Sequence, residues 1–438
     1  MGWSIDRALA ELDDHINLEA MAPSPDGGRS APPTLDRMVA LCALMADPQH
    51  AQPVIHVTGT NGKGSVVRMV SALLAASGLS VGTYTSPDLE RVNERLSRNG
   101  EPIDDEALAE AIGAVVELEA LSGLRPSRFE LLTLAAFRWF ADSAVDVAVL
   151  EVGMGGRWDA TNVADGAVAV VTNVSLDHTE YLGPTRHSIA LEKAGIVKPG
   201  ASLVLGETDP SLAAVFEGAG AATTWVRGRE LDCTDNVVAV GGRSVSLRTP
   251  GATYDDVFLS LHGAHQGDNA ALAVAAAEAF FGRPLEDDLV REGMASVEVP
   301  GRFEVLGRQP LVVIDGAHNP AGALTASATL DDFSVAGERI LVVGMNQGRD
   351  PVEMLQALGA ASARVVVACA ADMPRAMAAE EVASAARSLG VEADVVRSVP
   401  DALDRATALA TEDDIVLVTG SLYVVGAARA AWRRRTRP

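Results

Sequence analysis

A short apolar run, a glycine-rich turn and a helical pattern follow one another early in the 438-residue chain. The run is Val54 to Val57, and the turn reads T-G-T-N-G-K-G-S from Thr58 to Ser65. Apolar residues then recur at helical spacing from Val66 to Leu74, before Gly78. A strand that enters a glycine turn and a helix directs backbone N–H groups and the helix dipole at an anion. The segment therefore predicts a phosphate-binding loop in an α/β sheet.

Lysine is scarce in this chain, and nearly all positive charge comes from arginine. The three lysines are Lys63, Lys193 and Lys198. Arginine is a permanently charged fork, whereas the lysine amine is compact and can lose its proton and react. Lys63 lies in the glycine turn, where its ammonium would reach the β- and γ-phosphates of a nucleotide. The strict P-loop pattern is not met, because Val57 stands at the first glycine position and Gly64 separates the lysine from Ser65. A glycine turn without nucleotide is the alternative.

Strand and helix patterns alternate along the first part of the chain, which favours an α/β domain with ligands at the carboxyl ends of its strands. Continuous apolar runs of this kind are typical of buried parallel strands. The predicted strands are Val81–Tyr84, Val145–Val149 and Val168–Val171, and the predicted helices are Ile103–Leu121, Phe129–Phe140, Asn269–Phe280 and Leu285–Met294. Between Asn236 and His262 the pattern becomes β-rich, which predicts a small antiparallel sheet.

The alternation restarts after a candidate linker, Val297 to Gly301. The strands expected there are Leu311–Ile314, Ile340–Val343, Val365–Cys369 and Ile415–Val418. We therefore predict an N-terminal domain, residues 1–297, with a P-loop and a mostly parallel sheet. A smaller Rossmann-like domain, residues 298–438, follows it.

Composition excludes several classes of function. A formal net charge of −24 argues against a nucleic-acid partner and against anionic membrane surfaces. The three cysteines are too few and too scattered for a disulfide framework. No apolar run approaches the roughly 20 residues that a membrane span requires, and the N-terminus does not have the pattern of a signal peptide. We expect a cytoplasmic protein, and a monomer.

A series of motifs extends through almost the whole chain in one order. It comprises H-V-T-G-T-N-G-K-G-S, Y-T-S-P (Tyr84–Pro87), N-E-R (Asn93–Arg95), L-E-V-G-M-G-G-R-W-D-A-T-N (Leu150–Asn162), L-D-H-T-E-Y-L-G (Leu176–Gly183), E-K-A-G-I (Glu192–Ile196), H-Q-G-D-N-A (His265–Ala270), P-G-R-F-E (Pro300–Glu304), V-I-D-G-A-H-N-P (Val313–Pro320) and V-T-G-S-L-Y (Val418–Tyr423). Together they resemble the folylpolyglutamate synthase/dihydrofolate synthase family of Mur-type, ATP-dependent amide ligases.

The resemblance implies which residues bind ATP. These are Thr58, Gly59, Thr60, Asn61, Gly62, Lys63, Gly64 and Ser65 of the loop, with Gln266, Asn269, Arg302, Asp315 and His318. Arg302 would reach a phosphate, Asp315 the ribose, and Asn269 with Gln266 the adenine side. For Asp315 and His318, a turn that caps the next helix is a compatible interpretation. An ATP held by both domains would imply closure on binding.

The resemblance also implies metal ligands and a modified lysine. Ser86, Glu151 and His178 would bind Mg²⁺, and Lys193, carbamylated by CO₂, would hold a second Mg²⁺. From the residues alone, Glu151 and His178 follow strands that we expect to be neighbours, and manganese can also serve. Carbamylation needs a neutral amine, which arginine cannot supply. The alternatives are a hydrogen-bonded loop histidine at His178 and, at Lys193, an ammonium paired with Glu192 or with phosphate.

The implied reaction joins L-glutamate to a carboxylate of dihydropteroate or a reduced folate through an acyl phosphate. Catalysis would depend on Lys63, Lys193, His178 and Arg302, and substrate binding on Phe129, Asp88, Ser421 and Tyr423. Phe129 is equally compatible with a helix-core aromatic. Asp88, Trp158 and the stretch from Gly344 to Asp350 depart from the family pattern, which leaves folate and glutamate selectivity open.

Two rival functions remain from the sequence. A ligase of cell-wall precursors would share the phosphate loop and the modified lysine, but the short segment before Lys63 argues against a domain for a UDP sugar. A nucleotide-driven ATPase would form no amide product and would not need Arg302 and Asp315.

Overall fold

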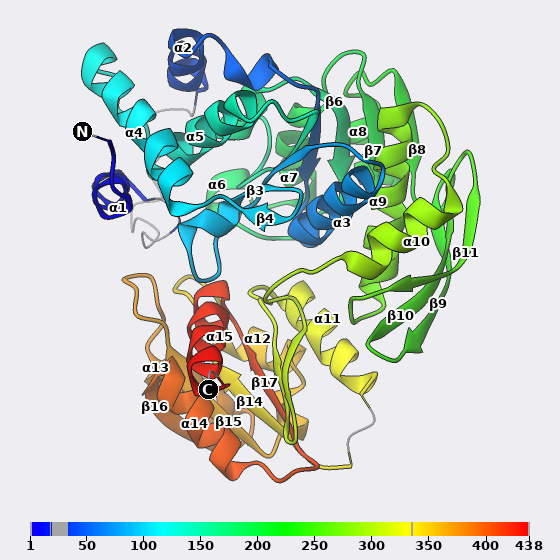
Figure 1. Ribbon diagram of the computed structural model, residues 1–438. Helices are drawn as coiled ribbons and strands as arrows, with labels where there is room; N and C mark the ends of the chain where they lie inside the picture. Colours follow the sequence, from blue (N-terminus) through cyan, green and yellow to red (C-terminus); the bar gives the residue numbers. More distant parts are fainter. Residues whose placement is uncertain (1, 18, 20–33, 334–335, 437–438) are drawn as a thin grey trace. The chain divides into compact units, whose positions relative to one another are not determined.

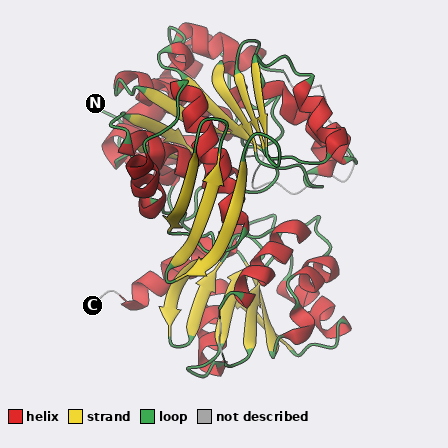
Figure 2. Cartoon of the chain, turned by 90° about the vertical axis from the view of Figure 1, so that its right-hand side faces the viewer, coloured by secondary structure: helices red, strands yellow, loops and turns green. Residues whose placement is uncertain are grey.

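The computed structural model describes residues 2–17, 19, 34–333 and 336–436, and the chain divides into two compact units (Figure 1). Of the described residues, the first unit comprises 2–17, 19, 34–260 and 266–298, and the second comprises 261–265, 299–333 and 336–436. In each unit the strands lie side by side with helices packed against them (Figure 2).

The first unit is built on an eight-stranded sheet in the order β4-β3-β2-β5-β1-β6-β7-β8. The strands are β1 (Val54–Thr58), β2 (Val81–Tyr84), β3 (Leu96–Arg98), β4 (Glu101–Pro102), β5 (Val147–Glu151), β6 (Gly166–Val171), β7 (Ser202–Leu205) and β8 (Thr223–Val226). All neighbours from β2 to β8 pair in parallel, whereas β3 and β4 are antiparallel. The predicted mostly parallel sheet is confirmed.

Helices and a smaller sheet complete this unit. The helices are α1 (Ile5–Asp13), α2 (Asp36–Leu44), α3 (Lys63–Ala76), α4 (Asp105–Ser122), α5 (Arg128–Asp142), α6 (Thr179–Leu182), α7 (Arg186–Lys193), α8 (Pro210–Glu217), α9 (His265–Phe281) and α10 (Asp287–Ser296). The predicted antiparallel excursion is present as β9 (Asp232–Ala239), β10 (Gly242–Arg248) and β11 (Thr253–Leu259). Helix α10 packs against α3 and β11.

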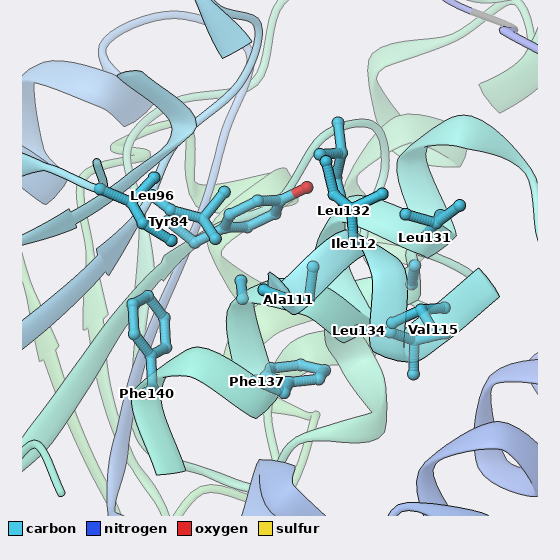
Figure 3. Close-up of a cluster of buried hydrophobic side chains, with 14 of the residues drawn as sticks. Tyr84, Leu96, Ala111, Ile112, Val115, Leu131, Leu132, Leu134, Phe137 and Phe140 are labelled. Atoms are coloured by element: carbon cyan, nitrogen blue, oxygen red, sulfur yellow. The ribbon is translucent and has the colours of Figure 1, made fainter. Parts of the chain in front are cut away.

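A hydrophobic core supports the strands whose ends carry the candidate site. Tyr84 of β2 and Leu96 of β3 pack with apolar side chains of α4 and α5 (Figure 3). Helix α5 begins with a capping box, in which Ser127 and Glu130 satisfy each other's backbone N–H groups. Strands β1, β2 and β5 are buried along their whole length, which explains why their sequences are nearly continuous apolar runs without polar alternation.

The second unit holds a six-stranded sheet in the order β12-β13-β17-β14-β15-β16. Its strands are β12 (Glu304–Arg308), β13 (Leu311–Ile314), β14 (Arg339–Val343), β15 (Val365–Ala370), β16 (Ala393–Ser398) and β17 (Ile415–Thr419), and its helices are α11 (Pro320–Asp331), α12 (Pro351–Ala357), α13 (Ala379–Ser388), α14 (Val399–Leu409) and α15 (Leu422–Thr436). Among these strands, β12 runs antiparallel to its neighbour and the others pair in parallel. Because β17 lies between β13 and β14, the strand order reverses there, which is where such sheets bind ligands.

Within the described part of the chain, no helix combines the length and the apolar character that crossing a membrane demands.

Candidate active site

The glycine-rich loop after β1 is held by the segment that follows β6. Thr60 N–H donates to the carbonyl of Asn173 at 2.9 Å, and Asn61 N–H donates to Asn173 Oδ1 at 3.1 Å. The hydroxyl of Thr172 donates to the Asn61 carbonyl at 2.6 Å. Since β1 and β6 are parallel neighbours, their carboxyl ends meet, and the loop conformation is set by side chains more than a hundred residues away.

Two glycines of the loop are required by close approach. A Cβ on Gly59 would lie 1.8 Å from Thr172 Oγ1. Gly62 has a φ of +84°, and a Cβ there would lie 2.7 Å from Asn269 Oδ1. Asn269 of α9 therefore lies against the loop, and its Nδ2 donates to Gln266 Oε1 at 2.9 Å. The structure thus brings Asn269 to the predicted phosphate loop, with Gln266 in contact with Asn269.

The loop leads directly into α3, whose first residue is Lys63. Lys63 Nζ donates to the carbonyl of Thr60 at 3.3 Å. The Thr58 hydroxyl at the end of β1 donates to the Gly155 carbonyl at 2.7 Å, and Ser65 is buried in the first turn of α3. An ammonium group, a helix N-terminus and glycine backbone are thus assembled as an anion site requires.

Lys193, the last residue of α7, reaches the same loop. Its side chain is buried, with 3% of the residue exposed, and Nζ donates to the carbonyl of Gly59 at 2.7 Å. The amine is thus directed at the loop and not at Glu192, which was one of the two partners in the ammonium alternative. Burial, reinforced by the charge of Lys63, lowers the pKa of Lys193 to about 7. A large fraction of this amine is therefore neutral near pH 7.

Glu151 and Ser86 lie together beside the loop. Glu151 is the buried last residue of β5, and its Oε2 accepts the Ser86 N–H at 3.2 Å. A Cβ on Gly64 would lie 3.5 Å from Glu151 Oε2, so this carboxylate faces the start of α3.

His178 stands in a strained backbone position after β6, with a φ of +50°. Its N–H donates to the side chain of Asp177 at 2.8 Å. The expectation that the strands before Glu151 and His178 are neighbours was wrong, because β1 lies between β5 and β6. Both strands flank the strand that carries the phosphate loop.

The described residues contain no group of three or more His, Cys, Asp and Glu side chains arranged to hold a metal. Of the predicted metal ligands, Glu151 and Ser86 are in contact, through the Ser86 N–H.

Phe129 lies at the start of α5 and packs on the core. Its ring centroid is 6.0 Å from that of Tyr84, and its Cζ would be 2.6 Å from a Cβ on Gly153 in the loop after β5. Beside it lies Asp159, a buried carboxylate that is absent from the residues predicted from the sequence. Asp159 Oδ1 accepts the N–H of Thr161 at 3.0 Å, and burial raises the pKa of Asp159. The D-A-T motif was the available signal in the sequence, because an aspartate often accepts a hydrogen bond from the backbone two residues further on.

Asp88 is engaged by a buried arginine. Its Oδ1 accepts from Arg95 Nε at 2.5 Å, and Arg95, only 2% exposed, also pairs with Glu19 at 2.6 Å. Burial by itself would raise the pKa of Asp88, but the charge and hydrogen bond of Arg95 lower it.

In the second unit, Arg302 and Asp315 belong to one hydrogen-bonded turn. Asp315 Oδ2 accepts from Phe303 N–H and Oδ1 from Ala317 N–H, each at 2.9 Å. Arg302 Nη1 donates to the carbonyl of Gly316 at 3.2 Å. Burial raises the pKa of Asp315, and the charge of Arg302 opposes that rise.

His318 and Ser421 also lie at this edge of the second sheet. His318 Nδ1 is 2.9 Å from the Gly316 carbonyl, and Ser421, after β17, has its Oγ 3.5 Å from Asn346 Oδ1. The N–H of Tyr423 donates to Ser421 Oγ at 3.3 Å, which caps the start of α15. Asn319 caps α11, as the capping interpretation of this turn expects.

Comparison with known proteins identifies the family to which the chain belongs. Residues 57–277 match the Mur ligase middle domain, and residues 301–422 match the Mur ligase, glutamate ligase domain. A dihydrofolate synthase/folylpolyglutamate synthase of Mycobacterium tuberculosis is 40% identical over 92% of this chain and 90% of its own length. The chain belongs to the folylpolyglutamate synthase/dihydrofolate synthase family of Mur ligases.

Solved structures agree with this assignment. The Escherichia coli enzyme in complex with DHPP and ADP has a TM-score of 0.87 and 31% identity, covering 99% of this chain and 99% of that one. A bifunctional synthase with Mn, AMPPNP and L-glutamate bound has a TM-score of 0.84 and 29% identity, covering 98% of both chains. The protein is an ATP-dependent ligase that adds L-glutamate to a folate or dihydropteroate carboxylate, and it uses ATP with a divalent metal ion.

Proposed function

We propose that the loop from Thr58 to Ser65 binds the triphosphate of ATP, with Lys63 neutralising the β- and γ-phosphates. Asn269, which lies against Gly62, and Gln266 would then contact the adenine side. Arg302 would supply a second cation to a phosphate, Asp315 would accept from the ribose, and His318 lies beside them. A protein with a net charge of −24 does not attract anions by its overall field, so these local cations must do so.

The next step of the proposal is that Lys193 is converted to a carbamate, and the surroundings of this side chain support it. The amine is buried, contacts the phosphate loop through Gly59 and has a pKa of about 7. A neutral amine can take up CO₂ and become an anionic oxygen donor. With Ser86, Glu151 and His178, this donor would complete a ligand set for two divalent ions, Mg²⁺ or Mn²⁺. Bound there, the metal would neutralise the negative charge of the transferring phosphoryl group.

The reaction then follows the order of an acyl transfer through phosphate. An acceptor carboxylate oxygen attacks the γ-phosphorus of ATP, the bond to the β-phosphate oxygen breaks, and ADP leaves. The amine of L-glutamate attacks the resulting acyl phosphate, loses a proton, and expels inorganic phosphate to form the amide. Lys63 and Arg302 stabilise charge that develops on phosphate oxygens, which is the dominant catalytic effect in phosphoryl transfer.

Phe129 is our candidate for stacking on the pterin ring, since its ring edge approaches Gly153 in the loop after β5. Ser421 and Tyr423 stay predicted substrate contacts. Asp88 also stays a prediction, and its ion pair with Arg95 indicates a role in holding the loop after β2. We further propose that the enzyme is a monomer in the cytoplasm, where its three free cysteines would stay reduced.

Product formation tests the proposal. Purified enzyme with Mg-ATP is supplied with dihydropteroate, tetrahydrofolate or a UDP-linked muramoyl acid, each with and without L-glutamate. We expect an amide product and stoichiometric phosphate only with a pteroate or folate acceptor and L-glutamate together. Amidation of the UDP-linked acid would favour a cell-wall ligase, and phosphate release that ignores every acceptor would favour an ATPase.

A further inference from the structure

The turn that carries Arg302 has a backbone conformation that needs support. Phe303, the next residue, has a φ of +45° although it is not glycine. The left-handed conformation costs an ordinary L-residue about 1–2 kcal/mol. Such a residue persists only where the surroundings fix it, and these positions gather at functional sites.

Hydrogen bonds from three directions fix this turn. The N–H of Phe303 donates to Asp315 Oδ2 at 2.9 Å, on the carboxyl end of β13. The N–H of Gly316 donates to the Gly301 carbonyl at 2.8 Å. The N–H of Gly301 donates to Glu304 Oε2, also at 2.8 Å. The two residues on either side of Arg302 are therefore tied to carboxylates of the same unit.

Glu304 is itself held by an arginine from the last helix. Arg429 of α15 donates from Nε to Glu304 Oε1 at 2.8 Å and to Oε2 at 2.9 Å. Only 9% of the Arg429 side chain and 24% of the Glu304 side chain are exposed. Because Arg429 is buried and Glu304 is partly buried, breaking the pair would leave the guanidinium charge poorly compensated. The chain of contacts runs from Arg429 through Glu304 and Gly301 to Arg302.

We propose that Glu304 and Arg429 are positioning residues, which set the turn at Gly301 so that Arg302 points at a phosphate of ATP. The inference rests on the proposed role of Arg302. Helix α15 would thereby contribute to the binding of ATP through Arg429, although no residue of that helix needs to contact the nucleotide. Neither residue is a catalytic residue.

A second ion pair of the same unit, at the opposite ends of the strands, provides the matched control. Arg364 contacts Asp414 at 3.2 Å, and the Asp414 side chain is 3% exposed. Asp414 directly precedes β17, whereas Asp315 directly follows β13, and these two strands are parallel neighbours. Asp414 therefore lies at the amino ends of these strands and Asp315 at their carboxyl ends. The control pair is thus at the opposite ends of the strands from the Arg302 turn.

The experiment measures kcat, KM for ATP and thermal unfolding for R429Q, R429K, E304Q, R302M and R364Q in the full chain. Misplacement of a group by about 1 Å can cost up to about a hundredfold in rate, so we expect R429Q and E304Q each to lower kcat/KM for ATP roughly tenfold to a hundredfold. KM for the folate acceptor should stay within about twofold. R429K, which retains the charge and can still donate to Glu304, should recover most of the loss. R364Q should lower the unfolding temperature and leave KM for ATP unchanged.

The E304Q/R429Q double variant adds a coupling test. If the two residues act only through each other, kcat/KM for ATP in the double variant should be no lower than in the worse single variant. The inference is overturned if R429Q and E304Q unfold at lower temperature, as R364Q does, but keep wild-type kcat/KM for ATP. If R302M also keeps wild-type kinetics, the proposed role of Arg302 fails first. An R302M variant that loses activity while R429Q does not would overturn the positioning role alone.

Discussion

The phosphate loop of the first unit and the Arg302 turn of the second present cations in different ways. The loop gains its shape from glycines, and Gly59 and Gly62 leave room for Thr172 and Asn269. The Arg302 turn places a phenylalanine in a left-handed conformation and holds it with the carboxylates of Asp315 and Glu304. Residues distant in sequence hold both elements, but only the loop has glycines at its left-handed and closely packed positions.

This difference has an energetic reason. Glycine adopts left-handed conformations without a steric penalty, so the loop backbone carries no such strain, and hydrogen bonds from Thr172 and Asn173 hold it in place. A non-glycine residue in the same conformation needs supporting hydrogen bonds, and the ones here originate from β13 and, through Glu304, from α15. The following variants compare what the cations and the glycines of these elements contribute to the use of ATP.

The largest effect is expected from Lys63→Met, compared with Arg302→Met. Loss of a cation at a transferring phosphoryl group costs on the order of 10³-fold in rate for the central charge and about 10²-fold for a peripheral one. We expect kcat/KM for ATP to fall by about those factors, measured as amide product formed. Circular dichroism serves as the folding control. Equal losses would place both cations equally close to the reacting phosphate, and a wild-type rate for K63M would refute the role of the loop.

Lys193→Arg should produce the next effect, a loss on the order of a hundredfold. Arginine stays charged and cannot form a carbamate. In the wild type, the folded-state pKa of about 7 means that the amine carries a proton below pH 7 and loses it above.

Enzyme freed of CO₂ by degassing should therefore regain activity on bicarbonate addition faster at pH 8 than at pH 6. Density for an unmodified amine, with nucleotide and metal bound, would count against the carbamate. Recovery that is independent of pH and of CO₂ would contradict it as well.

The smallest effect is expected from Gly62→Ala, with Gly78→Ala as its partner. Both glycines are left-handed, with φ of +84° and +86°, so both variants should lose about 1–2 kcal/mol of stability. A methyl group at Gly62 meets Asn269, whereas nothing lies within 4 Å of one at Gly78. Only G62A should raise KM for ATP, in steady-state assays. The same KM in both variants would show that the contact with Asn269 does not matter for the nucleotide.

Long, strongly patterned elements could be predicted from the sequence. Val81–Tyr84 and Leu311–Ile314 are strands over the predicted residues, and the helices near Phe129 and Asn269 differ only at their ends. The edge strands β4 and β12 and the short strand β3 were missed, because runs of two to five residues with charged or partly exposed side chains give little periodic signal.

The α/β class and the family could be read from the sequence, because they depend on local patterns and on motifs in a fixed order, and the glycine turn around Lys63 is a local pattern of the same kind. Tertiary structure alone decided that β1 separates the strands of Glu151 and His178, that Lys193 is buried against Gly59, and that Arg429 supports the Arg302 turn. The physical reason is that burial, pKa and ion pairing depend on which distant segments meet. Strand order and helix packing determine those contacts, and neither can be read from any short stretch of the chain.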